Sequence, residues 1–93
     1  MSDPWIDINR LASMARALSN PARIEILRTL AAAGERNCVD LTRQAGLAQS
    51  TVSEHLRVLR EAGLIEPCGP GARSGYCISR EGLLSLKQMI VAL

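Results

Sequence analysis

Apolar residues recur along this chain at the spacing of amphipathic helices, and polar or glycine-containing breaks separate the repeats. In the segment over residues 49–64, Val52, Leu56 and Leu59 fall at i, i+4 and i+7 and therefore share one helix face. Gly63 stands where a left-handed C-terminal cap is expected. The opposite side is polar, with small hydroxyl side chains near its start. This pattern predicts a helix packed on one side, which suits either insertion into a DNA major groove or an ordinary protein surface.

The residues before this segment predict three more helices. The first covers residues 6–18, and Asp3 and Pro4 precede it as a start signal. Asn20 is the expected N-cap of the second, with Pro21 in its first turn, and this helix runs over residues 22–33. The third is short and covers residues 38–45, after a polar connector. The predicted core positions are Ile8, Leu11, Met14, Ala15 and Leu18 in the first, Ile24, Ile26, Leu27 and Leu30 in the second, and Val39, Leu41 and Ala45 in the third.

The third helix and the segment over residues 49–64 are joined by a tight turn at residues 46–48. Gly46 lies where the backbone must reverse without a side chain in the way. Leu47 is expected to fill the gap between the two helices. A short helix, a tight turn and a second helix form a helix-turn-helix, which is common in DNA-binding proteins but also occurs in proteins that never contact DNA.

Two short extended runs follow, over residues 64–68 and 76–78, with a glycine-rich stretch between them. They predict a β-hairpin, called the wing below. Pro67 cannot donate to a strand ladder, so the first strand should be an edge or be interrupted there. The predicted fold is therefore mainly α with a small β-hairpin: a winged helix-turn-helix of about five helices.

A last helix is predicted over residues 80–93, with Ser79 as its cap. Its apolar stripe consists of Leu83, Leu86, Ile90 and Leu93, with Leu84 and Met89 beside it. A fold of this size cannot easily cover both this helix and the first one. We therefore expect a homodimer through residues 5–18 and 80–93, although both helices could instead pack only on their own domain.

Composition places the chain among compact proteins of one domain, residues 1–93, because 47% of its residues are apolar. No apolar run approaches the roughly 20 residues that span a membrane. The N-terminus lacks a basic region followed by an apolar one, so we expect a cytoplasmic protein. The net charge of +2 says little about partners, and ten of the eleven basic residues are arginine.

The first turns of the helix over residues 49–64 carry the side chains expected to read bases. Glutamine can pair with adenine, and serine and threonine can read any base pair. His55 and Arg57 are expected to hold phosphates, and Arg73 could reach DNA from the wing tip. Glu54 and Glu61 have the wrong sign for a polyanion, so they either accept from a cytosine amine or pair with arginines. The predicted DNA contacts are Gln49, Ser50, Thr51, Ser53, Glu54, His55, Arg57 and Arg73.

The chain has three cysteines, an odd number that favours reduced thiols over a disulfide framework. If the wing turns symmetrically about residues 72 and 73, Cys68 and Cys77 lie opposite each other on adjacent strands, close enough to bond. Such a thiol pair could alter DNA affinity by reshaping the wing. The alternative is that both are small apolar fillers, and the same holds for Cys38.

Two stretches resemble the ArsR/SmtB-type bacterial repressors. Residues 17–27 read ALSNPARIEIL, similar to that family's "aLsdptRl.IL" opening. Asp40 and Leu41, followed by QSTVSEHLRVLREAGLI over residues 49–65, match its "DL…SqstvS.HL..LreAGLv" signature. The resemblance covers about residues 10–80. It implies a homodimeric winged helix-turn-helix that binds double-stranded operator DNA and represses a nearby gene until an inducer releases it.

The chain departs from that family where metals bind. Metal-sensing members carry Cys-Val-Cys-Asp-Leu before the helix-turn-helix, whereas Asn37 and Val39 hold the two ligand positions here, with Cys38 between them. Other members bind zinc through Asp and His on the last helix, and residues 80–93 contain neither. His55, the only histidine, cannot make a zinc site alone. We therefore expect no metal and no cofactor. Family members also often have serine where Ala48 precedes the recognition helix.

Two other classes of protein are alternatives to a repressor. A winged-helix interaction module without DNA binding would explain the small net charge and the two glutamates at 54 and 61. An enzyme is disfavoured, because the single histidine has no convincing acid partner. The glycines at 69 and 71 do not open a helix, so they do not form a phosphate-binding loop.

Overall fold

The computed structural model describes residues 6–69 and 75–93. Its elements, in chain order, are α1 (Ile8–Ala17), α2 (Pro21–Ala33), α3 (Cys38–Ala45), α4 (Gln49–Glu61), β1 (Ile65–Pro67), β2 (Tyr76–Ile78) and α5 (Arg80–Ala92). The predicted order, with a hairpin between the fourth and fifth helices, is confirmed. Among the described residues, no helix is long and apolar enough to cross a membrane.

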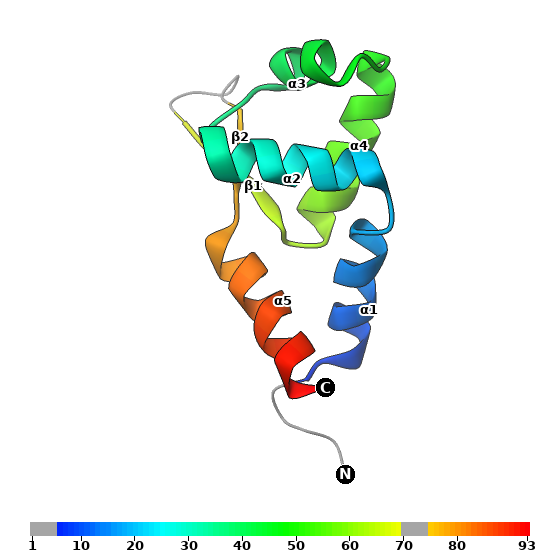
Figure 1. Ribbon diagram of the computed structural model, residues 1–93, viewed down its shortest axis with the longest axis vertical. Coiled ribbons are helices and arrows are strands. Elements are labelled where there is room, and N and C mark those ends of the chain that lie inside the picture. The colour runs from blue at the N-terminus through cyan, green and yellow to red at the C-terminus, as the bar shows by residue number, and fades with distance from the viewer. Residues whose placement is uncertain (1–5, 70–74) are drawn as a thin grey trace.

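The helix-turn-helix and the terminal helices occupy opposite ends of the molecule (Figure 1). At one end α3 packs on α4, and at the other α1 and α5 lie side by side. Between them α2 crosses the molecule and contacts both α4 and β2. This arrangement leaves two separate surfaces, one on α3 and α4 and one on α1 and α5.

The hydrophobic core joins these elements around α4. Met14, Val52 and Leu59 have no exposed surface, and Leu30, Leu41, Leu56 and Leu86 are nearly as buried. The predicted stripe of α4 is thus confirmed. Leu64 and Ile65, which lead into β1, belong to the same core.

Several other predicted core positions were wrong because the buried faces are rotated from the predicted stripes. On α1 the buried residues are Met14 and Ala17, while Ile8 is 71% exposed. On α2 the buried face runs through Ile26, Leu27 and Leu30, so Ile24 is turned outward. The other predicted core positions that are exposed are Ala15, Val39 and Ala45. The apolar stripe of α5 is also exposed at Ile90 and Leu93, within the range expected to meet a second copy.

The helix ends follow their capping residues. The Asn20 side chain accepts from the backbone N–H of Ala22 at 2.8 Å, and α2 starts at Pro21. α1 starts later than predicted because Asp7 caps it, accepting from the N–H of Arg10. The predicted start signal at residues 3 and 4 lies outside the described residues.

The end of α4 meets the start of α5. Gly63 has a φ of +79° and Leu64 donates its N–H to the carbonyl of Leu59 at 3.0 Å, as in a Schellman motif. The predicted left-handed cap at Gly63 is therefore confirmed. Gly82, in the first turn of α5, lies against the backbone of Gly63: a Cβ at Gly82 would stand 1.8 Å from the Gly63 carbonyl oxygen. This close approach requires glycine at position 82.

We expect Gly82→Ala to destabilise the fold by about 1–3 kcal/mol, the usual cost of overpacking. The sign of the change in unfolding free energy is informative, because replacing glycine by alanine inside a free helix stabilises that helix by about 1 kcal/mol. Urea unfolding at a fixed protein concentration measures the effect. Arg28→Ala, an exposed change on α2, is the control and should lie within about 0.5 kcal/mol of the unmodified chain. An unchanged urea midpoint for Gly82→Ala would contradict the close approach.

Candidate nucleic-acid interface

The turn between α3 and α4 places the start of α4 at one end of the molecule. Gly46 adopts the left-handed conformation, φ +68°, and donates its N–H to the carbonyl of Thr42 at 3.1 Å. Leu47 is 39% exposed and borders a hollow of about 330 Å³ between α2 and α3. Ala48 is the N-cap of α4 and provides no side-chain hydrogen bond. The first N–H groups of α4 therefore have no side-chain cap.

The buried stripe of α4 determines which side chains face outward. Because Val52, Leu56 and Leu59 are packed in the core, the polar residues of the first two turns point to solvent. His55 is half-buried at the edge of this face. Arg73 lies outside the described residues. The exposed predicted contacts are Gln49, Ser50, Thr51, Ser53, Glu54 and Arg57.

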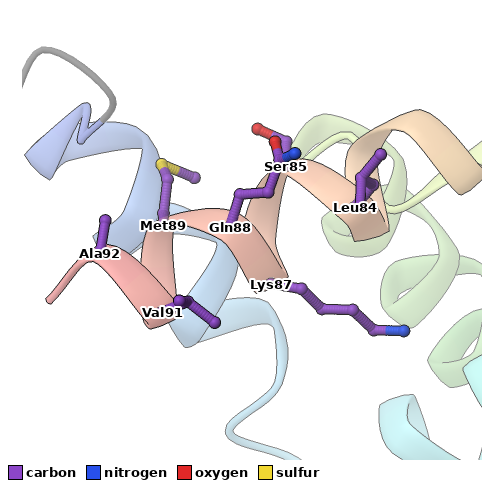
Figure 2. A pocket seen from close by; sticks show the side chains of 7 residues that line it. All are labelled: Leu84, Ser85, Lys87, Gln88, Met89, Val91 and Ala92. Carbon is purple, nitrogen blue, oxygen red and sulfur yellow. The ribbon is translucent and has the colours of Figure 1, made fainter.

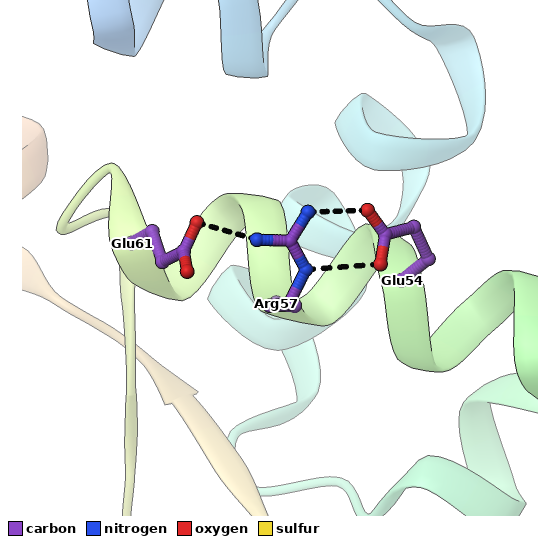
Figure 3. A network of polar contacts seen from close by, with 3 residues as sticks. All are labelled: Glu54, Arg57 and Glu61. Atoms are coloured by element: carbon purple, nitrogen blue, oxygen red, sulfur yellow. Dashed lines mark hydrogen bonds and ion pairs between the residues drawn. The ribbon is translucent and has the colours of Figure 1, made fainter.

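Arg57 is held between two carboxylates of its own helix (Figure 3). Its Nε donates to Glu54 Oε2 at 2.9 Å, and a second guanidinium nitrogen donates to Glu54 Oε1. A third nitrogen donates to Glu61 Oε2 at 2.7 Å. All three side chains are more than half exposed. Both glutamates therefore pair with an arginine, which is one of the two roles expected for them.

This pairing shifts the pKa values of Glu54 and Arg57. The hydrogen bonds from Arg57 hold the pKa of Glu54 below its ordinary value, against an opposing effect of desolvation. The hydrogen bonds to Glu54 and Glu61 raise the pKa of Arg57. Each charge favours the ionised form of the other. This part of the exposed face of α4 therefore joins the guanidinium of Arg57 to the carboxylates of Glu54 and Glu61.

Cys38 connects the two helices of the motif. It is the first residue of α3, and its Sγ lies 3.5 Å from Ser53 Oγ and 3.9 Å from Thr42 Oγ1. The thiol is half-buried. It packs between α3 and α4, which agrees with the prediction of a small filler and ties the hydroxyl of Ser53 to α3.

The wing contains a disulfide between Cys68 and Cys77, whose Cα atoms are 5.8 Å apart. The predicted register was wrong. Glu66 pairs with Cys77, and Cys68 donates its N–H to the carbonyl of Gly75, so the two cysteines are diagonal rather than opposite. Diagonal positions lie on the same face of a hairpin, which is why the sulfur atoms still meet. The turn residues about which symmetry was assumed lie outside the described residues.

Arg36 and Asn37, in the polar connector between α2 and α3, have roles that were not predicted from the sequence. Arg36 exchanges backbone hydrogen bonds with Tyr76, at 2.8 and 3.1 Å, and so adds a bridge to the outer side of β2. Gly75 passes so close to the Arg36 carbonyl that a Cβ would stand 2.4 Å from it. Asn37 caps α3 by accepting from the N–H of Asp40. The cap had a local signal, an asparagine just before a helix, whereas the bridge had none.

A second exposed surface lies on the terminal helices, away from α3 and α4. Figure 2 shows a hollow of about 650 Å³ along α5, lined by Leu84, Met89 and Val91 together with polar side chains. Val91 and Leu93 are 87% and 82% exposed. Ile8 of α1 and Ile90 of α5 add further apolar surface. Within residues 6–69 and 75–93, no three His, Cys, Asp or Glu residues lie together as metal ligands would.

Helix-turn-helix, exposed polar first turns and wing together define a winged helix-turn-helix regulator. Known proteins that are similar to this chain belong to the same class. A helix-turn-helix domain model matches residues 18–68. The HTH-type transcriptional regulator YgaV of Escherichia coli is 35% identical over 72 residues, which cover 77% of this chain and 73% of YgaV. The biofilm growth-associated repressor of Xylella fastidiosa is 40% identical over 58 residues, 62% of this chain and 50% of that protein.

A solved structure extends the likeness to most of the chain. The homodimeric winged helix-turn-helix DNA-binding domain Mb0332 of Mycobacterium bovis, described as a possible ArsR-family regulator, aligns with a TM-score of 0.73. It is 32% identical, and the alignment covers 91% of this chain and 80% of that one. This chain belongs to the ArsR family of winged helix-turn-helix transcriptional regulators, which are not enzymes. It spans about half the length of the Xylella repressor.

Proposed function

We propose that this chain is a transcriptional repressor that binds double-stranded operator DNA as a homodimer. The observation that carries the proposal is the start of α4, whose polar side chains are exposed while its apolar stripe is buried. An α-helix presented in this way can enter the major groove with its N-terminal residues at the base edges. The repressor of Xylella fastidiosa supports the direction of regulation.

The roles of the contacts follow from their places on α4. Gln49, Ser50 and Thr51 lie in the first turn and can donate to or accept from bases, and Ser53 follows in the second. His55, at the edge of the face, is placed for a phosphate. Arg73 is proposed as a contact from the wing tip. Phosphate contacts of this kind set the register of the protein on DNA and base contacts set the sequence.

The apolar face of α1 and α5 is proposed as the dimer interface. Ile8, Ile90, Val91 and Leu93 are exposed there, and α1 and α5 lie at the end of the molecule opposite α3 and the start of α4. Pairing this end would leave both copies of α4 free, as a two-fold symmetric operator requires. The homodimeric Mb0332 domain supports this arrangement. We also propose that residues 1–93 act as one domain in the cytoplasm, where operator DNA is found.

A second candidate function is a repressor that responds to oxidants through Cys68 and Cys77. The disulfide between them favours it. Hydrogen peroxide would take two electrons and two protons from the two thiols, leaving the disulfide and two molecules of water. A change in the wing caused by this reaction can reach the helix-turn-helix, because β2 is bridged to Arg36, next to the cap of α3.

The DNA-binding proposal is tested by a mobility-shift assay on DNA upstream of the chain's own gene, with the salt concentration varied. Ser50→Ala should reduce the preference for this DNA over a scrambled sequence by roughly tenfold, since one base contact contributes about 1–3 kcal/mol. The salt dependence should not change, because no phosphate contact is removed. Ser19→Ala, at an exposed serine between α1 and α2, is the matched control. Absence of binding at any salt concentration would favour an interaction module instead.

The dimer proposal is tested by Val91→Asp, which would place an unpaired carboxylate in an apolar interface. Sedimentation velocity should show the unmodified chain as a dimer and the variant as a monomer. Val39→Asp makes the same change on α3, where the side chain is also exposed, and should remain dimeric. A monomer of the unmodified chain at concentrations that saturate operator would contradict the proposal.

If the repressor responds to oxidants, operator affinity should depend on whether Cys68 and Cys77 form a disulfide or remain thiols. A tethered hairpin loses less conformational freedom on binding, so the disulfide form should bind about threefold to tenfold more tightly than the dithiol form. Fluorescence anisotropy after peroxide and after dithiothreitol measures this ratio. The ratio should vanish in Cys68→Ser and persist in Cys38→Ser. Equal affinities of the two forms of the unmodified chain would remove the hypothesis.

A further inference from the structure

We propose that Glu54 selects a cytosine in the operator through its carboxylate, and that Arg57 is the residue that positions it. The inference rests on the proposed DNA binding and names the base that this part of the site recognises. It begins from the place of Glu54, which follows Ser53 in the second turn of α4 and has a side chain 57% exposed. It lies one turn after Ser50, on the face proposed to enter the groove.

The guanidinium of Arg57 fixes the orientation of this carboxylate. Two of its nitrogens meet the two oxygens of Glu54, and the third is occupied by Glu61. Such a two-point contact restrains a carboxylate in direction as well as in distance. Each Glu54 oxygen accepts one hydrogen bond from Arg57 and keeps a further lone pair. These contacts use three of the five N–H donors of Arg57, so a phosphate contact would fall to the two that remain.

The chemistry of the major groove then selects the base. An ionised carboxylate can only accept hydrogen bonds. Guanine presents two acceptors in this groove, thymine presents an acceptor and a methyl group, and adenine presents its amine beside the N7 acceptor. Cytosine alone presents a donor without an adjacent acceptor. A carboxylate in this position therefore favours cytosine over adenine, whose N7 acceptor lies beside its amine, and is unfavourable opposite guanine and thymine.

The same carboxylate should weaken binding to DNA of any sequence. It adds a negative charge to a surface that approaches phosphates, and Glu61 adds another. Glu54→Gln removes the charge at nearly constant volume. The variant should therefore lose a base preference and gain nonspecific affinity, two changes of opposite sign that the loss of a structural residue would not produce.

The experiment is enrichment of operator sequences from a random DNA pool by the full chain, with nonspecific affinity measured on a scrambled duplex. The unmodified chain should show a cytosine preference of about tenfold at one position of each half-site. Glu54→Gln should abolish the preference at that position alone and bind the scrambled duplex more tightly. Glu61→Gln, which removes the charge of the other partner of Arg57, should keep the cytosine preference.

Arg57 is tested in the same pool. If it positions Glu54, Arg57→Ala should lower the preference at the cytosine position, and Arg57→Lys should restore part of it. Uniformly weaker binding with a smaller salt dependence and an intact cytosine preference would make Arg57 a phosphate contact and overturn its positioning role. An unchanged preference at every position in Glu54→Gln would overturn the inference while leaving DNA binding in place. Enrichment of no sequence by the unmodified chain would overturn the proposed function, and the inference with it.

Discussion

Burial of one stripe of α4 is the constraint on which the rest of this molecule depends. Val52, Leu56 and Leu59 are almost completely removed from solvent, and they pack in the same core as Met14 of α1 and Leu86 of α5. A helix held on one side cannot rotate about its axis without exposing these side chains, which costs about 1.5–3 kcal/mol for each. The direction of every polar residue on α4 is therefore set by the core and not by the residues themselves.

A second constraint fixes the position of α4 relative to α5. α4 ends in a Schellman motif at Gly63, and Gly82 brings the first turn of α5 directly against that backbone. With no side chain between them, the exit of α4 and the entry of α5 have little freedom to move apart or to slide. If the apolar surface of α5 joins two copies, this contact determines how far apart and at what angle the two α4 helices stand.

The exposed surface near α4 is organised by local networks rather than by net charge. Glu54, Arg57 and Glu61 are linked within one helix. The wing is closed by its disulfide and joined to the connector before α3 by the bridge between Arg36 and Tyr76. The small positive charge of the chain is thus compatible with a DNA-binding face, since attraction to phosphates need not come from the residues that read bases.

Local patterns in the sequence determined the number and order of the helices, the caps at Asn20 and Gly63, the turn at Gly46 and the buried stripe of α4. These features depend on residues within one or two turns of each other, so periodicity and capping rules are sufficient to predict them. The recognition helix, and hence the candidate site, could be predicted for the same reason.

Only the tertiary structure decided which faces of α1, α2 and α5 are buried, the register of the wing and the bridge at Arg36. A stripe of apolar residues does not say which neighbour covers it, and the length of a turn does not define a register when several are sterically allowed. The structure also showed that Arg57 is paired with Glu54 and Glu61, because whether a guanidinium is free or held depends on side-chain directions that residue spacing does not determine. The buried stripe of α4 was thus predictable from the sequence, while the pairing of charged side chains on its exposed side was decided by folding.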